Sequence, residues 1–249
     1  MSDLMLHCGG EIATLEQIAA APVPEATDSY CPISHIDFVH MLDESTRRHF
    51  GTDTEITSTY GLTRDGARMF GVVDIKMESG QHCLSIGVRN SLDKKFSAGV
   101  ALGAKVFVCD NLCFSSSGIN VFRKHTPNIV RDLRPMIDNA ITLSTDEYRV
   151  ISESWEAMKE IPVSLDMGYK GIGLAQGHGV LTPTQASVAF QEWQQPSHEE
   201  FEDRNAFCLY QAFTEAAKKG RPELIMDRYP AINAFFDEAI TGRTEAIAA

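Results

Sequence analysis

The sequence has no run of 18 apolar residues, although 43% of its 249 residues are hydrophobic. Because a helix needs about 20 such residues to span a bilayer, we expect no membrane-spanning segment and no membrane partner. The opening stretch, MSDLMLHCGGEIATLEQ, contains acidic residues and lacks the basic and apolar segments of a secretory signal. Without an export signal, the six cysteines are expected to be reduced thiols. These features predict a soluble, cytoplasmic protein.

Tight cysteine pairs are also missing. Cys109 and Cys113 have C-x3-C spacing, but the chain has no C-x2-C pair, and a structural zinc site needs four converging ligands. Lys124 and His125 follow Cys113 after a short loop, which leaves a reactive thiolate open as an alternative. The simplest interpretation is a pair of free cysteines acting as small buried hydrophobic residues. We therefore assign no metal, no cofactor and no catalytic residue, and we favour a non-enzymatic role while leaving an enzyme open as the alternative.

A glycine-rich segment, GYKGIGLAQGHGV, has five glycines between Gly168 and Gly179, with Lys170 and His178 among them. Glycine-rich loops can hold phosphate through backbone N–H groups. Dinucleotide-binding and Walker motifs also require a preceding strand and a fixed spacing, which this segment lacks. We interpret it as a mobile connection between helical subdomains, with a functional lid as the alternative.

Basic residues are scarce overall, because 22 Lys and Arg stand against 34 Asp and Glu, a net charge of −12. This balance argues against an electrostatic nucleic-acid-binding protein. The segment 81–135 is different, since its eight basic and three acidic residues give a net charge of +5. A basic segment in an acidic chain is typical of a surface that contacts phosphate or another anion. The alternative is a surface that only balances the charges of neighbouring elements.

Local patterns predict an α+β fold, with an antiparallel sheet over about residues 54–109 and a mainly helical C-terminal half. The sheet is indicated by short β-rich runs, such as ARMFGVVDIKM and HCLSIGVRN, separated by turn residues. We divide the chain into residues 1–52 (a lead-in and a helix), 53–162 (the sheet plus helices) and 163–249 (a helical region after the glycine-rich loop).

Capping residues predict where several helices begin. Ser34 with Asp37 is typical of a helix N-terminus. Thr126-Pro127 predicts the start of another helix, in which Pro135 predicts a kink or break. Ser144 with Glu147 forms a second capping-box pattern and therefore predicts a separate helix after that break.

The basic segment offers candidate anion-binding residues at two places, a predicted hairpin turn and the entry to a predicted helix. Arginine and lysine beside a helix N-terminus form a typical phosphate-contact set. Interleaved phenylalanines could stack on bases if exposed, although core burial is their usual fate; they are Phe96, Phe107, Phe114 and Phe122. The candidate anion-binding residues are Arg89, Asn90, Lys94, Lys95, Arg123, Lys124, His125 and Arg131.

Two other charge patterns favour different functions. Asp74-x-Lys76 near a strand end is similar to a metal-dependent nuclease core, which would need a further carboxylate from Asp65 or Glu78. An exposed strand face explains both charges equally well. Residues 136–203 contain 12 acidic and three basic residues, and this acidic surface could bind a basic partner or mimic DNA.

The block SIGVRNSLDKKFSAGVALGAKVFVCDNLCFSSS, with FRKHTPN after it, resembles the central part of the DUF932 family of phage/plasmid-like (UPF0380 prophage) proteins. The matching motifs are Arg89-Asn90-Ser91 with Asp93, residues 106–111 and Lys124-His125-Thr126. Trp193 and Asn205-Ala206 resemble a weaker C-terminal signature of the family. The resemblance implies a gene of phages, plasmids or prophages in a bacterial host, near DNA-repair and anti-restriction genes. It implies no catalytic residue.

Together, the basic segment and the resemblance predict a nucleic-acid-associated accessory protein of a mobile element. Single-stranded DNA binding or annealing, with a homo-oligomer as the assembly, is the first hypothesis. The second is a counter-defence or host-takeover protein that contacts a host defence or DNA-processing protein through its acidic surface. The third is a metal-dependent, nuclease-like hydrolase.

Overall fold

The computed structural model describes residues 11–77, 82–106, 112–114, 120–219 and 222–240. Tertiary contacts divide the chain into two compact units. The first unit comprises Met1–Lys105 and Ile119–Tyr148, and the second comprises Val106–Gly118 and Arg149–Ala249. None of the helices in the described ranges is both long enough and apolar enough to cross a membrane.

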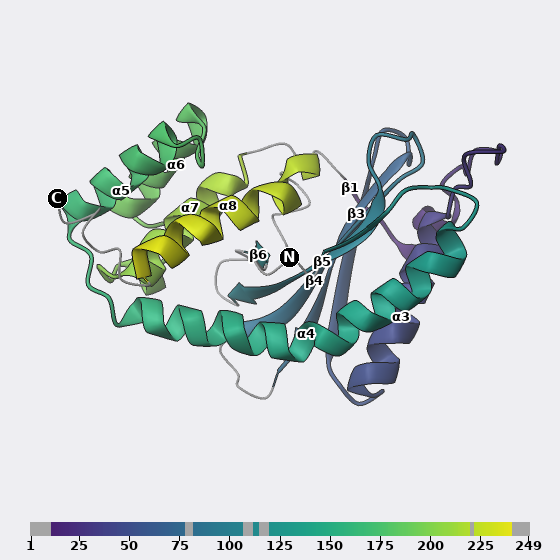
Figure 1. Ribbon diagram of the computed structural model, residues 1–249, viewed down its shortest axis with the longest axis horizontal. Coiled ribbons are helices and arrows are strands. Elements are labelled where there is room, and N and C mark those ends of the chain that lie inside the picture. Colours follow the sequence, from purple (N-terminus) through teal and green to yellow (C-terminus); the bar gives the residue numbers. More distant parts are fainter. Residues whose placement is uncertain (1–10, 78–81, 107–111, 115–119, 220–221, 241–249) are drawn as a thin grey trace. The chain divides into compact units, whose positions relative to one another are not determined.

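Six strands of the first unit form an antiparallel sheet (Figure 1). Successive strands from β1 to β5 are neighbours, and β7 pairs with β5. Together with the helices that follow, this sheet confirms the predicted α+β class. The strands are β1 (Glu11–Ile12), β2 (Ile56–Thr63), β3 (Arg68–Lys76), β4 (His82–Ser91), β5 (Ala98–Val106) and β7 (Asn120–Arg123).

The helices of the first unit are α2 (Leu15–Ala19), α3 (His35–Phe50) and the first part of α4 (Ile129–Lys159). The Ser34 hydroxyl accepts the Asp37 N–H at 3.0 Å, which confirms the predicted cap of α3. In Figure 1, α3 lies beside the first half of α4, and an ion pair of 2.8 Å joins Glu44 to Arg134. Exposed ion pairs contribute less than about 1 kcal/mol each, so buried apolar packing holds these helices. Its fully buried residues include Phe38, Leu42, Leu133 and Ile137.

Helix α4 is one helix of 31 residues, and the predicted break and second N-terminus are both wrong. Pro135 lies inside the helix without ending it. Ser144 does not cap, because its hydroxyl donates to the Ile141 carbonyl oxygen at 2.7 Å within the helix. A serine that bonds back to the preceding turn can occupy a helix interior, which the capping pattern alone does not reveal.

The connection between β2 and β3 is a tight turn at residues 64–67. Asp65 has a φ of 55° and Gly66 a φ of 81°, and the Ala67 N–H donates to the Arg64 carbonyl at 3.0 Å. Asp-Gly is a favoured pair for such positive-φ hairpin turns. The Gly66 carbonyl accepts a hydrogen bond from His35 Nε2 at 2.9 Å, which ties this turn to the start of α3.

The second unit is mainly helical. Its elements are the last part of α4, β6 (Leu112–Phe114), α5 (Leu165–Gly177), α6 (Pro183–Gln194), the short 3-10 helix η1 (Glu199–Phe201), α7 (Ala206–Ala217) and α8 (Pro222–Ile240). Ser164, Thr182 and Asn205 cap α5, α6 and α7 through their side chains. Aromatic rings fill its core, including Trp155, Phe207, Tyr210, Phe213 and Phe236.

Residues 168–177 of the glycine-rich segment are not a connection but part of helix α5, and Gly179 follows the helix with a φ of 75°. Gly168 faces the indole of the buried Trp193, whose Nε1 donates to the Leu165 carbonyl at 3.1 Å. A Cβ at Gly168 would overlap that indole ring. The glycine therefore allows α5 and α6 to approach closely, which composition alone does not show.

Gly168→Ala is expected to lower the free energy of unfolding of the second unit by about 1–3 kcal/mol, because the added methyl overpacks the core. Gly173→Ala is the matched control on the same helix, since its Cβ would meet nothing within 4 Å. There, better helix propensity is expected to raise stability by about 0.5–1 kcal/mol. Urea denaturation followed by tryptophan fluorescence measures both variants, and equal midpoints would contradict the packing described.

Candidate anion-binding pocket

The turn between β4 and β5 places two lysines at the surface. Ser91 organises this turn, because its hydroxyl donates to Asp93 at 2.5 Å and accepts the Lys95 N–H at 3.0 Å. Lys94 has a φ of 64°, a left-handed conformation that non-glycine residues rarely adopt. Both lysine side chains are exposed. The strand ends and these hydrogen bonds therefore fix the backbone from which the ammonium groups extend.

A second segment, just before α4, lies close to the chain near Tyr30. The Cys31 N–H donates to the His125 carbonyl at 3.1 Å, and the Ile33 N–H donates to His125 Nδ1 at 3.2 Å. The Tyr30 hydroxyl donates to the Leu92 carbonyl at 2.9 Å. These bonds join residues 30–33 both to the helix entry and to the β4–β5 turn.

These three segments line one hollow of about 480 Å³, formed by residues 29–30, 94–97 and 124–126. We call it the lysine pocket, because Lys94, Lys95 and Lys124 all line it. Among the described residues that form its lining, none is acidic. Tyr30 and Phe96 supply aromatic walls, and Lys94 Nζ lies 4.2 Å from the centroid of the Tyr30 ring.

The three lysines carry their charge without a carboxylate partner among the described residues. Like charges gathered in a hollow repel one another and raise the local concentration of anions. An anion that enters the lysine pocket therefore relieves repulsion as well as gaining attraction. The geometry suits a group with concentrated negative charge.

Two buried polar atoms of the pocket lining have no hydrogen-bond partner, His125 Nε2 and Thr126 Oγ1. The His125 side chain is 6% exposed, and burial, with a smaller contribution from nearby His35, lowers its pKa to about 4. His125 is therefore neutral at pH 7. Because its Nδ1 accepts the Ile33 N–H, the ring proton lies on Nε2, which is a free donor.

Four of the eight candidate residues line the lysine pocket, namely Lys94, Lys95, Lys124 and His125. The other four make contacts outside its lining. Arg89 is 7% exposed, and its guanidinium lies 4.2 Å from the Phe122 ring centroid. Asn90 is fully buried and bonds the Ile33 carbonyl and His35 Nδ1. Arg123 and Arg131 both form ion pairs with Asp132 on α4.

Sequence reasoning missed the part of the pocket that residues 29–30 contribute. Tyr30 lies 62 residues before its hydrogen-bond partner Leu92, and no local pattern links the two segments. Thr126 was expected to cap a helix, but α4 begins at Ile129 and the Thr126 hydroxyl has no hydrogen-bond partner. The residue belongs instead to the pocket lining. The resemblance motif Lys124-His125-Thr126 is the signal that could have grouped these residues.

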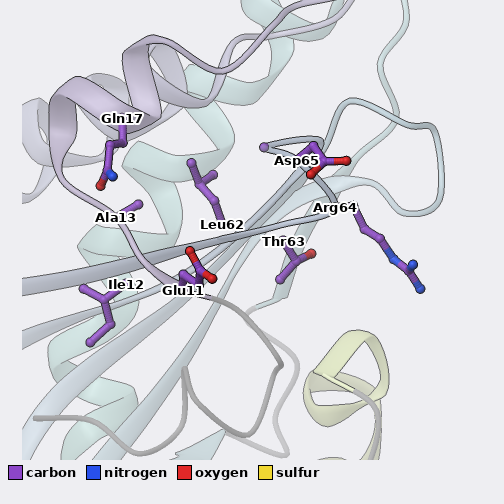
Figure 2. Close-up of a pocket in the computed structure, with 9 residues that line it drawn as sticks. Glu11, Ile12, Ala13, Gln17, Leu62, Thr63, Arg64 and Asp65 are labelled. Carbon is purple, nitrogen blue, oxygen red and sulfur yellow. The ribbon is translucent and has the colours of Figure 1, made fainter.

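A second, smaller hollow of about 290 Å³ lies between β1, the start of α2 and the β2–β3 turn (Figure 2). Its lining includes the carboxylates Glu11 and Asp65, and Arg64 extends away from the residues of β1 and α2 in Figure 2. Its charge is thus unlike that of the lysine pocket.

The residues of the nuclease hypothesis are engaged with neighbours. Asp74 accepts a hydrogen bond from Ser85 at 2.5 Å, and Lys76 pairs with Glu55 at 2.8 Å. Asp65 lies beyond the opposite end of β3, about 20 Å away by the rise of an extended strand. In the described ranges, no group of three or more His, Cys, Asp or Glu could hold a metal ion.

Several predicted features fall outside the described residues. They are Glu78, Phe107, Cys109 and the side chains of Lys105, Cys113 and Phe114. Among the described cysteines, none of Cys31, Cys83 and Cys208 forms a disulfide bond. Burial, as the main cause, raises the pKa of the Cys208 thiol to about 11, so it is protonated at neutral pH.

Comparison with known proteins gives no relative, since no family model, no curated protein and no solved structure matches the chain. The DUF932 resemblance therefore stays a prediction. The function has to be argued from the lysine pocket itself.

Proposed function

We propose that the first unit binds single-stranded nucleic acid through the lysine pocket, as an accessory protein of a mobile element. The observation that carries this proposal is that Lys94, Lys95 and Lys124 line one hollow with no acidic residue in its described lining. Phosphate groups are the anions that nucleic acids present to such clusters. The half-buried Phe96 ring, also in the lining, offers an apolar wall for a base or sugar.

A single strand fits this pocket better than a duplex. The hollow of about 480 Å³ is the size of a pocket for a small ligand, whereas a duplex presents a wide and stiff surface. An unpaired strand can bend one nucleotide into a hollow because its bases are not held in a stack. The negative charge of the chain as a whole, −12, keeps non-specific contacts weak and concentrates binding at the pocket.

The combined variant Lys94→Ala, Lys95→Ala and Lys124→Ala is expected to bind a fluorescent oligothymidylate at least about tenfold more weakly at low salt. Because each lysine that contacts a phosphate of a single strand contributes about 0.7 to the salt slope, the slope of log K against log salt should fall by about 2. Fluorescence anisotropy at several salt concentrations measures both quantities.

The matched control changes three exposed lysines outside the pocket, Lys76, Lys170 and Lys219, to Ala. This control variant loses the same total positive charge. It therefore distinguishes an effect of the pocket lysines on binding from an effect of the overall charge of the protein. The control should bind like the unaltered protein. No binding by the unaltered protein at low salt, or equal losses in both triple variants, would overturn the proposal.

A further inference from the structure

We infer that the lysine pocket selects a terminal phosphate group, a phosphomonoester carried by the end of a strand or by a free nucleotide. The inference rests on the proposed function, because it names the part of the nucleic acid that enters the pocket. Three features of the lining support it: its charge, its two polar atoms without a hydrogen-bond partner, and its size.

The charge of the pocket matches a phosphomonoester better than an internal phosphate. Lys94, Lys95 and Lys124 all line one hollow. A phosphodiester linkage carries one negative charge, whereas a phosphomonoester carries about −1.5 to −2 at neutral pH. The end of a strand therefore brings more charge into the pocket than any internal position does.

Two polar atoms without a hydrogen-bond partner favour a ligand that carries hydrogen-bond acceptors. His125 Nε2 and Thr126 Oγ1 are buried without a partner, and both residues belong to the pocket lining. A buried donor left unpaired is unfavourable unless a ligand satisfies it. A phosphomonoester has three strong acceptor oxygens, which can accept from these two groups and from a lysine at once.

The size of the hollow suits a single terminal nucleotide. Residues from three separate segments line a hollow of about 480 Å³, within the range of pockets that hold one small ligand. Ser29 and Ser97, which belong to the same lining, add hydroxyl donors. An end can enter such a hollow directly, whereas an internal phosphate must bring both flanking nucleotides with it.

The test compares two fluorescent oligothymidylates of equal length, one phosphorylated at its end and one with hydroxyl groups at both ends. At moderate salt the phosphorylated strand is expected to bind about tenfold more tightly. Competition with thymidine monophosphate and with thymidine then shows whether the phosphomonoester belongs to a strand end or to a free nucleotide. If the monophosphate competes as well as the phosphorylated strand, the ligand is a free nucleotide. If only the strand competes, the ligand is a strand end. Either result supports a phosphomonoester.

Two conservative variants remove the proposed donors while they keep the backbone contacts. Thr126→Val loses the hydroxyl group. His125→Asn keeps an acceptor for the Ile33 N–H but loses the Nε2 donor. Both are expected to reduce the preference for the phosphorylated strand several-fold. Thr142→Val and His40→Asn, at exposed positions of α4 and α3, are the matched controls.

The outcomes separate the two proposals. If neither strand binds, the proposed function fails and this inference fails with it. If both strands bind equally, the proposed function stands and this inference alone is overturned. A preference that survives unchanged in both Thr126→Val and His125→Asn would also overturn it, because the selecting groups would then lie elsewhere.

Discussion

Replacing Asn90 with Leu is expected to lower the free energy of unfolding of the first unit by about 2–5 kcal/mol. Asn90 is fully buried, and its side-chain amide bonds the Ile33 carbonyl at 3.1 Å and His35 Nδ1 at 2.9 Å. Leucine is close in size but leaves both acceptors without a partner inside the protein. Each buried polar group left unpaired costs about 1–3 kcal/mol.

Hydrogen exchange measured by mass spectrometry on peptides from β3 and β4 is the appropriate probe for this variant. Both tryptophans, Trp155 and Trp193, belong to the second unit, so their fluorescence reports on that unit instead. Asn139→Leu, at an exposed position of α4 in the first unit, is the control and should change stability by less than about 0.5 kcal/mol. Equal exchange in Asn90→Leu and the unaltered protein would contradict a structural role for Asn90.

The first unit is expected to lose stability as the pH falls from about 6.5 to about 4. Burial, with a smaller contribution from His35, lowers the pKa of His125 from its usual 6.5 to about 4. Between these values the unfolded chain binds a proton that the folded chain does not. The contribution of neutral His125 is therefore complete above pH 6.5 and lost as the pH approaches 4, a change of up to about 3 kcal/mol. Burial also lowers the pKa of His35, which acts in the same direction.

His125→Asn tests this pH dependence. Asparagine can accept the Ile33 N–H but does not titrate in this range, so the variant should lose less stability between pH 6.5 and 4 than the unaltered protein. Chemical denaturation at several pH values, followed by hydrogen exchange in the first unit, measures the difference. An identical decline in both proteins would show that His125 is not the titrating group.

Much of the fold could be predicted from the sequence because its signals are local. The alternating and turn residues that indicate β3 and β4 depend on their immediate neighbours, and so does the cap Ser34. The wrong predictions concern residues with two local options. A serine such as Ser144 can cap a helix or donate to the carbonyl of the preceding turn, as it does here. A glycine such as Gly168 can belong to a flexible loop or can allow a bulky ring to pack against the backbone, as Trp193 does here. Only tertiary packing decides between such options.

The candidate site could be predicted only in part, for a similar reason. Lys94, Lys95, Lys124 and His125 were found because a turn and a helix entry expose charge. Arg89 and Asn90 carry the same kind of sequence signal, but they lie on a strand that is buried on both faces. Arg123 and Arg131 both pair with Asp132, so their charges are partly balanced by a carboxylate, unlike those of the pocket lysines.

The pocket walls come from three stretches of chain that are far apart in sequence, at residues 29–30, 94–97 and 124–126. An occupant that contacts all three stretches would bind the folded unit and not the unfolded chain. Ligand at a hundred times its dissociation constant would then stabilise the folded unit by about 2.7 kcal/mol. If the proposed ligand binds there, it is expected to slow proteolysis of the chain.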